Sequence, residues 1–225
     1  MKNTNIKVAI LEDHQSVIDG YLYRLSAEPR IQVVASIFFG EDLEQTLLQY
    51  QVDVLLLDIH VPTSPSNENP FPVLHSISTL MQRDPNLSVL VISMHTQTAL
   101  IQTFVDAGVS GYVFKDDYES IRQLPKIVLL VANGGIYFSE NAYKKLRLAA
   151  SEGTGPLLSP RQIEVLSLCV AFPDESTAEL AERLGVASST LRNLFSTAYV
   201  RLGVHTRVAA IAKIQKMGLI PRNLE

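Results

Sequence analysis

Val54-Leu-Leu-Leu-Asp58 is the stretch that decides the fold, because four consecutive apolar residues end directly on a carboxylate. A short apolar run of this kind is typical of a strand buried on both faces of a parallel sheet. Outward from it, the first 130 residues alternate short β-branched runs with longer amphipathic segments, which predicts repeated strand–helix–strand units. We expect five parallel strands, at residues 7–11, 31–37, 54–58, 88–93 and 111–114.

Helical patterns occupy the segments around these strands, at residues 16–27, 43–50, 73–83, 98–107 and 120–132. Gly108 and Gly134 stand just after two of them, where glycine commonly ends a helix. The alternation predicts an α/β domain over residues 1–134, built on a five-stranded, parallel, doubly wound sheet.

The pattern changes after residue 134. Residues 135–156 hold a short helical pattern and then Ser151-Glu-Gly-Thr-Gly-Pro156, which we interpret as a linker with a flexible joint. Residues 157–225 are helical throughout and predict an all-α domain of four helices, with Gly185 in a turn and Ser188 capping the next helix. The predicted helices lie at residues 160–170, 177–184, 188–202 and 207–217.

Charge is distributed unevenly along the chain. The formal net charge is −4, yet residues 1–154 carry 11 Lys and Arg against 17 Asp and Glu, whereas residues 155–225 carry 8 against 6. The small basic surplus favours the C-terminal part as the place of any nucleic-acid contact.

The apolar runs of this chain are far too short to cross a bilayer. The first residues lead straight into a strand pattern without the features of a secretory signal. The single cysteine, Cys169, cannot form an internal disulfide and lies in an apolar stretch. We therefore expect a cytoplasmic protein without membrane contact.

Polar and charged residues end the predicted strands, although the strands themselves are nearly all apolar. In a parallel sheet these ends meet at one edge, which is where open α/β sheets bind their ligands. The residues are Glu12, Asp13, Asp58, Ser93 and Lys115. Three carboxylates at one edge would repel one another unless a divalent cation lay among them, and hard oxygen ligands favour Mg²⁺. We expect Asp13 and Asp58 to bind the metal, Glu12 to bind it directly or through water, and the carbonyl of His60 to add an oxygen.

This arrangement suits phosphoryl transfer to a carboxylate, because Mg²⁺ and Lys115 can neutralise charge on the phosphoryl oxygens. Asp58 is the expected acceptor, since it closes the most hydrophobic strand, and Ser93 is expected to hydrogen-bond a phosphoryl oxygen. An Mg²⁺-dependent aspartyl phosphatase is the enzymatic alternative. Such enzymes usually need a second carboxylate two residues after the nucleophile, where this chain has His60. We therefore expect a regulator and not an enzyme.

Four segments of residues 6–130 resemble the receiver domain of two-component response regulators, which has a flavodoxin-like fold. The segments are Ile10-Leu-Glu-Asp-His14, Val54-Leu-Leu-Leu-Asp-Ile-His-Val-Pro62, Val91-Ile-Ser-Met-His95 and Gly108-Val-Ser-Gly-Tyr-Val-Phe-Lys115. The resemblance implies that a partner histidine kinase phosphorylates Asp58. It also implies that Ser93 and Tyr112 form a switch pair, with the hydroxyl moving toward the phosphate and the ring rotating inward.

The chain departs from that family after Asp58. The segment from Pro62 to Pro72 holds four prolines, is about six residues longer than usual, and lacks the glycine that usually opens the next helix. We expect a stiff, extended loop beside the acceptor. Either it narrows access to Asp58 and changes phosphorylation rates, or it is a tolerated surface insertion.

The C-terminal domain resembles LuxR-type helix-turn-helix domains over residues 157–220. The resemblance lies in Leu158-Ser-Pro-Arg-Gln-Ile-Glu-Val-Leu166, Thr177-Ala-Glu-Leu-Ala-Glu-Arg-Leu-Gly-Val186, Ser188-Ser-Thr-Leu-Arg-Asn193 and Arg201-Leu-Gly-Val204. The helix that begins near Ser188 is expected to enter the major groove of double-stranded DNA. The expected DNA contacts are Thr190, Arg192, Asn193, Ser196, Arg201 and Arg207.

Together the two domains resemble the NarL/FixJ class of response regulators. The resemblance implies a transcription regulator that forms a homodimer when active, binds promoter DNA, can contact RNA polymerase, and hides its recognition helix when unphosphorylated. Two alternatives remain open: a regulator that works without phosphorylation, and an interaction module whose altered helix-turn-helix no longer binds DNA. An acidic pair, Asp174 and Glu175, in a connection about two residues longer than usual, gives the second alternative its basis.

Overall fold

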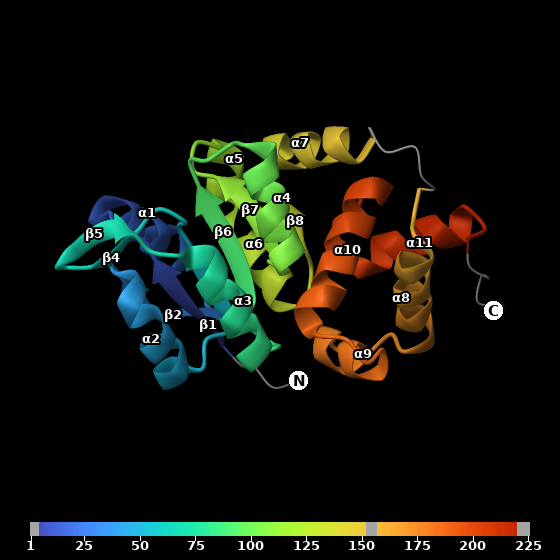
Figure 1. Cartoon of the computed structure of the whole chain (residues 1–225), viewed down its shortest axis with the longest axis horizontal. Coiled ribbons are helices and arrows are strands. Elements are labelled where there is room, and N and C mark those ends of the chain that lie inside the picture. Colours follow the sequence, from blue (N-terminus) through green and yellow to red (C-terminus); the bar gives the residue numbers. More distant parts are fainter. Residues whose placement is uncertain (1–4, 152–156, 220–225) are drawn as a thin grey trace.

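The computed structural model describes residues 5–151 and 157–219. Its centre is a parallel sheet with the strand order β2-β1-β3-β6-β7-β8 (Figure 1). The bounds of these strands are Ile6–Leu11 (β1), Ile31–Ile37 (β2), Val54–Leu57 (β3), Ser88–Ser93 (β6), Gly111–Phe114 (β7) and Tyr137–Phe138 (β8). All five predicted strands form, and the short β8 extends the sheet by one strand drawn from the segment that we interpreted as a linker.

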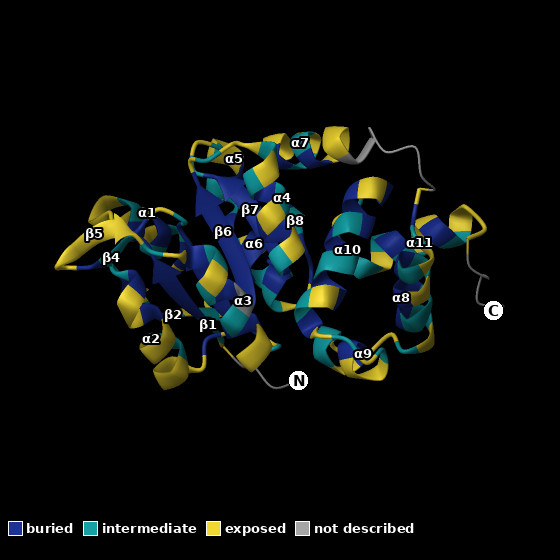
Figure 2. Ribbon diagram, in the orientation of Figure 1, coloured by how far each residue is buried: buried dark blue, intermediate teal, exposed yellow. Residues whose placement is uncertain are grey.

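The helices of the α/β domain cover both faces of this sheet, as the doubly wound prediction requires. Alternate residues of β1 and β3 face opposite sides: Val8 and Val54 pack with α1 and α6, while Ala9 and Leu55 belong to the core that includes α3 and α4. Figure 2 shows the sheet buried and the outer faces of the helices exposed. The helices are Gln15–Leu25 (α1), Leu43–Tyr50 (α2), Val73–Arg83 (α3), Thr98–Ala107 (α4), Tyr118–Arg122 (α5) and Leu124–Ala132 (α6).

One predicted helix is in fact two. The pattern at residues 120–132 divides at Gln123, which ends α5 and serves as the N-cap of α6. Pro125 lies in the first turn of α6, where its missing N–H leaves no helical hydrogen bond unmade. Proline therefore starts a new helix here instead of continuing the previous one.

The segment after Asp58 is a β-hairpin, so the prediction of an extended loop was wrong. β4 (Pro62–Ser64) pairs antiparallel with β5 (Asn67–Pro70), and the hairpin projects from one end of the molecule (Figure 1). The Thr63 hydroxyl donates a hydrogen bond to the Asn69 carbonyl at 2.8 Å. At the base of the hairpin, the ring of Phe71 lies against Gly40, in the short 3-10 helix η1 (Gly40–Asp42), at a distance that leaves no room for a side chain at residue 40. Phe71 thus anchors the hairpin to the domain.

The C-terminal part is all-helical, as predicted. It contains α8 (Pro160–Ala171), α9 (Thr177–Arg183), α10 (Ser188–Leu202) and α11 (Arg207–Lys216), preceded by α7 (Glu140–Ser151). Most of the flexible joint that we predicted, residues 152–156, lies outside the described residues. In the described ranges 5–151 and 157–219, no helix combines the length and the apolar character needed to span a bilayer.

Local signals in this part were mostly interpreted correctly. Gly185 adopts a φ of 63° in the predicted turn, and the helix before it, α9, begins with a capping box of Ser176 and Glu179. The expected cap at Ser188 was wrong: Ala187 is the N-cap of α10, and Ser188 is buried in the first turn. An extended backbone at Ala187 is enough to begin the helix without a side-chain cap.

Helix α10 is the element of the C-terminal part that faces the α/β domain (Figure 1). One side packs on α8, α9 and α11, and the other packs on α3, α4 and α7. The close approach depends on Gly108, whose φ is 90°, because a Cβ atom there would lie 2.7 Å from the Ser189 carbonyl oxygen. The hydrophobic core on this face of the sheet is accordingly continuous with that of the helical part.

Candidate functional site

The carboxyl ends of β1, β3 and β7 bring three charged side chains into direct contact. The Lys115 ammonium lies 2.8 Å from an Asp58 carboxylate oxygen and 2.6 Å from Glu12. Asp58 is 7% exposed and Glu12 is 1% exposed, so both carboxylates are largely removed from water. This convergence is what the strand-end positions predicted, and it makes Lys115 the cation that compensates two buried negative charges.

Burial and hydrogen bonding act in opposite directions on Lys115. Desolvation of the ammonium favours its neutral form, but hydrogen bonds to Asp58 and Glu12 and the attraction of both carboxylates outweigh it, so the pKa of Lys115 is raised. Lys115 therefore stays charged at neutral pH. The Lys115 ammonium donates a hydrogen bond to Oδ2 of Asp58, and the backbone N–H of His60 donates one to Oδ1 of Asp58 at 3.3 Å.

A candidate metal site adjoins this ion pair. Glu12, Asp13 and His14 each present one ligand atom, and these atoms lie within 4.8 Å of one another. His14 Nδ1 is 2.8 Å from Asp13 and 3.1 Å from Glu12, and the hydrogen bond to Asp13 is the main reason why the pKa of His14 is raised. Together with Asp58, the edge carries three carboxylates against one lysine, a donor set that fits a hard divalent cation such as Mg²⁺.

Sequence reasoning did not include His14 in this cluster, although its place directly after Asp13 at a strand end was a usable signal. The predicted ligation by the His60 carbonyl has no counterpart among the contacts of this structure and stays a prediction. The ring of His60 is instead 6.3 Å from the ring of His95, centroid to centroid.

Ser93 and Tyr112, the predicted switch pair, are both buried beside this edge. The Ser93 hydroxyl accepts a hydrogen bond from the His95 N–H at 3.2 Å, and the Tyr112 hydroxyl donates to the His95 carbonyl at 2.8 Å. The Tyr112 ring has no exposed surface and contacts Phe104 and Phe114, and its burial raises its pKa to about 12. The ring is thus already in an inward position, and the expected rotation stays a prediction.

Five of the six residues predicted to contact DNA, those on α10, fall into two groups. Thr190 and Arg201 are exposed. Arg192 and Ser196 are buried, at 7% and 0% exposure, and Asn193 is half-buried.

The second group faces the α/β domain. An Arg192 Nη2–H donates to the Pro85 carbonyl, and the Asn193 amide donates to the carbonyl and the carboxylate of Asp106, each at 3.2 Å. Ser196 follows them by one helical turn on the same side of α10. The part of α10 that we predicted to read base edges is therefore covered in this arrangement.

This contact leaves polar atoms without partners. In the described part of the chain, Arg192 Nη1 and Ser196 Oγ are buried and make no hydrogen bond. Burying an unpaired polar atom costs roughly 1–3 kcal/mol, and more when the group is charged. The packing of α10 on the α/β domain is therefore less favourable than its apolar contacts alone would make it.

Arg207, the last predicted contact, lies at the start of α11. Its Nη1–H donates to the Glu175 carbonyl at 2.6 Å, and its guanidinium lies 5.6 Å from the centroid of the Phe195 ring. The Glu175 carboxylate forms an ion pair with Arg183. The acidic connection before α9 thus has half of its charge compensated within its own domain.

Two family models match the chain in the order of its two parts. The model described as "Response regulator receiver domain" matches residues 8–126, and the model described as "Bacterial regulatory proteins, luxR family" matches residues 156–214.

Two relatives match this chain over nearly its whole length and theirs. The chain is 27% identical to the transcriptional regulatory protein DegU of Brevibacillus brevis, over 98% of this chain and 97% of DegU. It is 28% identical to the transcriptional regulatory protein MctR of Rhizobium johnstonii, over 96% of each chain. Among solved structures, the RcsB response regulator of Salmonella typhimurium is 24% identical, with a TM-score of 0.56 over 94% of this chain and 100% of that one. This structural likeness supports the fold.

Proposed function

Because this chain belongs to the response-regulator family, with a receiver domain followed by a LuxR-type DNA-binding domain, we propose that phosphorylation of Asp58 controls whether α10 can bind promoter DNA. The observation that carries the proposal is the burial of Arg192 and Ser196 against the receiver domain, because the same residues cannot contact both that domain and a base edge. Release of α10 is then the regulated step.

The chemistry proposed at Asp58 is phosphoryl transfer from a histidine kinase. An Asp58 oxygen bonds to phosphorus as the bond from phosphorus to the kinase's histidine nitrogen breaks, which yields an aspartyl phosphate and a neutral histidine. Glu12, Asp13 and Asp58 would hold Mg²⁺, which neutralises charge on the phosphoryl oxygens. Lys115, now bound to Asp58 Oδ2, is placed to follow the new negative charge, and Ser93 is placed to donate its hydroxyl.

Phosphorylation can act on α10 through the contacts of the switch residues. Ser93 and Tyr112 both bond His95, which lies in the connection from β6 to α4, and α4 carries Asp106 and leads into Gly108. A movement of Ser93 toward a phosphoryl group would break its bond with the His95 N–H and displace this connection. Because the packed state already contains unpaired buried atoms, a small differential free energy can shift the population toward an open form.

The open form is proposed to bind DNA as a homodimer in the cytoplasm. Solved RcsB structures include two RcsB dimers bound to DNA and RcsB bound to a promoter in the presence of the phosphomimetic BeF3⁻, and we carry this behaviour to the present chain as part of the proposal. Val208 on α11 is 77% exposed and is a candidate for the dimer contact, which would be made beside the DNA. Contact with RNA polymerase would follow at the promoter.

The proposal is tested by incubating the chain with Mg²⁺ and acetyl phosphate and following three quantities: the hydroxylamine-sensitive gain in mass, the oligomeric state and the affinity for duplex DNA at fixed salt. We expect the wild type to gain one phosphoryl group and to bind DNA more tightly, and Asp58→Asn to do neither. Asp53→Asn is the matched control, because this exposed carboxylate lies at the opposite end of the same strand.

Labelling of Asp58 without any change in DNA affinity would contradict the control of α10. Tight DNA binding that is the same in the wild type and in Asp58→Asn would favour a regulator that works without phosphorylation.

A further inference from the structure

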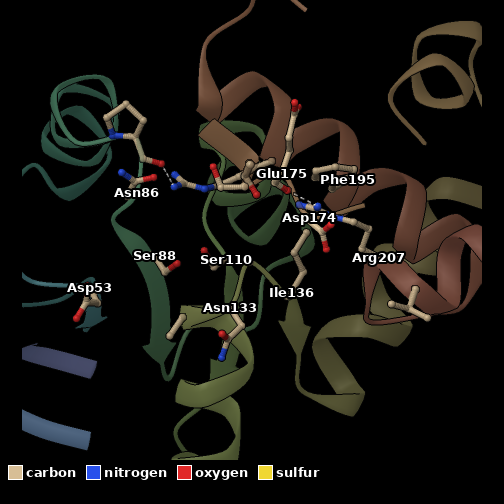
Figure 3. Close-up of a pocket in the computed structure, with 18 of the residues that line it drawn as sticks. Asp53, Asn86, Ser88, Ser110, Asn133, Ile136, Asp174, Glu175, Phe195 and Arg207 are labelled. Atoms are coloured by element: carbon tan, nitrogen blue, oxygen red, sulfur yellow. Dashed lines mark hydrogen bonds between the residues drawn. The ribbon is translucent and has the colours of Figure 1, made fainter. Parts of the chain in front are cut away.

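A cavity of about 520 Å³ lies between the two domains, away from Asp58. Asp53 and Ser88, at the starts of β3 and β6, line it from the receiver domain, whereas Asp58 and Ser93 follow or end the same strands at the opposite edge. Figure 3 shows these residues and Asn133 across the cavity from Phe195 and Arg207 of the DNA-binding domain. The cavity is therefore separate from the phosphorylation site and is formed by both domains.

Arg192 lines this cavity with an incompletely bonded charge. The side chain is 93% buried, Nη2–H donates to the Pro85 carbonyl, and Nη1 has no hydrogen-bond partner. Burial lowers the pKa of the guanidinium to about 10, and the attraction of the Asp84 carboxylate opposes this shift without outweighing it. A buried cation in this condition gains free energy from any anion that can approach it.

Arg207 lines the cavity as the second cation. It bonds a backbone carbonyl and lies over the Phe195 ring, and in the described ranges neither Arg192 nor Arg207 forms an ion pair with a carboxylate. Of the acidic residues that line the cavity, Glu175 is paired with Arg183, while Asp53 and Asp174 are exposed, so water screens their charge. The buried part of the cavity thus carries uncompensated positive charge.

We infer that this cavity binds a small molecule through a carboxylate or phosphate group held between Arg192 and Arg207. The anion would approach the guanidinium of Arg192 from the cavity side. Because Nη1 has almost no exposed surface, the side chain would shift toward the anion to give Nη1 the acceptor that it lacks. Planar guanidinium groups suit both kinds of oxyanion. Side chains of Asn86, Ser110 and Asn133 offer hydrogen bonds to the rest of the ligand. Because both domains form the site, the ligand would stabilise the closed arrangement and oppose the release of α10. The inference needs only the packed arrangement and does not depend on Asp58 being phosphorylated.

The test is isothermal titration of the full, unphosphorylated chain, without Mg²⁺ and at constant ionic strength, with inorganic phosphate in one arm and malonate in the other. We expect saturable binding at one site in at least one arm, and the arm that binds identifies the oxyanion. Arg192→Gln should weaken this binding at least tenfold, because a hydrogen bond to a charged group is lost. Arg147→Gln is the matched control, since Arg147 on α7 is exposed and does not line the cavity, and this variant should bind the anion as the wild type does.

A second variant approaches the cavity from the receiver side. Asn86→Phe places a bulky side chain in the cavity without changing either arginine, and it should also weaken binding, while cooperative thermal unfolding shows that the variant is folded. The inference is overturned if neither anion binds the wild type saturably, or if folded Arg192→Gln and Asn86→Phe bind as tightly as the wild type.

Discussion

At the scale of single residues, Lys115 neutralises carboxylate charge that a metal ion would otherwise neutralise. Its ammonium lies 2.8 Å from Asp58 and 2.6 Å from Glu12. Lys115→Met removes this charge and leaves three carboxylates at the edge. We expect Mg²⁺ to bind the variant about tenfold more tightly than the wild type, since a unit charge at this distance is worth on the order of 1–4 kcal/mol at the effective dielectric of a protein surface.

Calorimetric titration with Mg²⁺ measures this difference, and Lys126→Met, which removes an exposed lysine from α6, is the control. Equal Mg²⁺ affinities in the wild type and in Lys115→Met would contradict the competition between lysine and metal.

The sequence predicted the residues of this edge well, and it did so for a geometric reason. Parallel strands all end at the same edge, so Glu12, Asp58 and Lys115 had to meet once the strands were recognised. The predicted DNA contacts were harder to interpret, because a polar side chain on a helix surface suits DNA and another protein domain equally well. Arg192 and Asn193 bond the receiver domain here, and nothing in the residue type distinguishes the two uses.

At the scale of elements, the hairpin of β4 and β5 is the main departure from the expected receiver pattern. The sequence did not reveal it, because β5 is entirely exposed and the segment therefore lacks the alternation of apolar residues that marks a strand. Replacing residues 64–69 by a two-residue turn should speed the labelling of Asp58 by acetyl phosphate severalfold, if the hairpin restricts access to the acceptor.

Labelling rates followed by mass spectrometry measure this effect, and thermal unfolding should change little because the removed residues contribute few buried contacts. An unchanged labelling rate would make the hairpin a tolerated surface insertion.

The start of α8 is a second element with a measurable contribution. Ser159 and Gln162 form a reciprocal capping box, and the Gln162 amide also donates to the Thr197 hydroxyl of α10 at 2.8 Å. Ser159→Ala should lower the free energy of unfolding by about 1 kcal/mol, since one helix N–H loses its acceptor. Urea unfolding measures the loss, and Ser16→Ala, at an exposed position of α1, should change stability by less than about 0.5 kcal/mol. Similar values for the two variants would contradict the role of the cap.

At the scale of the whole molecule, the closed arrangement depends on the close approach of α10 to the end of α4. Gly108→Ala would place a Cβ atom 2.7 Å from the Ser189 carbonyl oxygen and so separate the domains. Because the DNA-binding domain itself is unchanged, we expect the unphosphorylated variant to bind duplex DNA severalfold more tightly than the wild type at the same salt concentration.

Gly134→Ala controls for backbone strain, since Gly134 also has a positive φ but its added Cβ would make only an ordinary contact, at 3.4 Å from Thr177. If both variants bind DNA as the wild type does, the contact at Gly108 does not hold α10 closed.

The central claim, that phosphorylation of Asp58 uncovers α10, is tested most directly by the accessibility of residue 196. Ser196→Cys introduces a thiol at a position with no exposed surface, and the native Cys169, which is buried within the DNA-binding domain, serves as an internal control. Addition of Mg²⁺ and BeF3⁻ should raise the rate of alkylation at residue 196 at least tenfold and leave the rate at Cys169 unchanged. The response at residue 196 should disappear in the double variant that also carries Asp58→Asn. An alkylation rate at residue 196 that does not respond to Mg²⁺ and BeF3⁻ would contradict the claim.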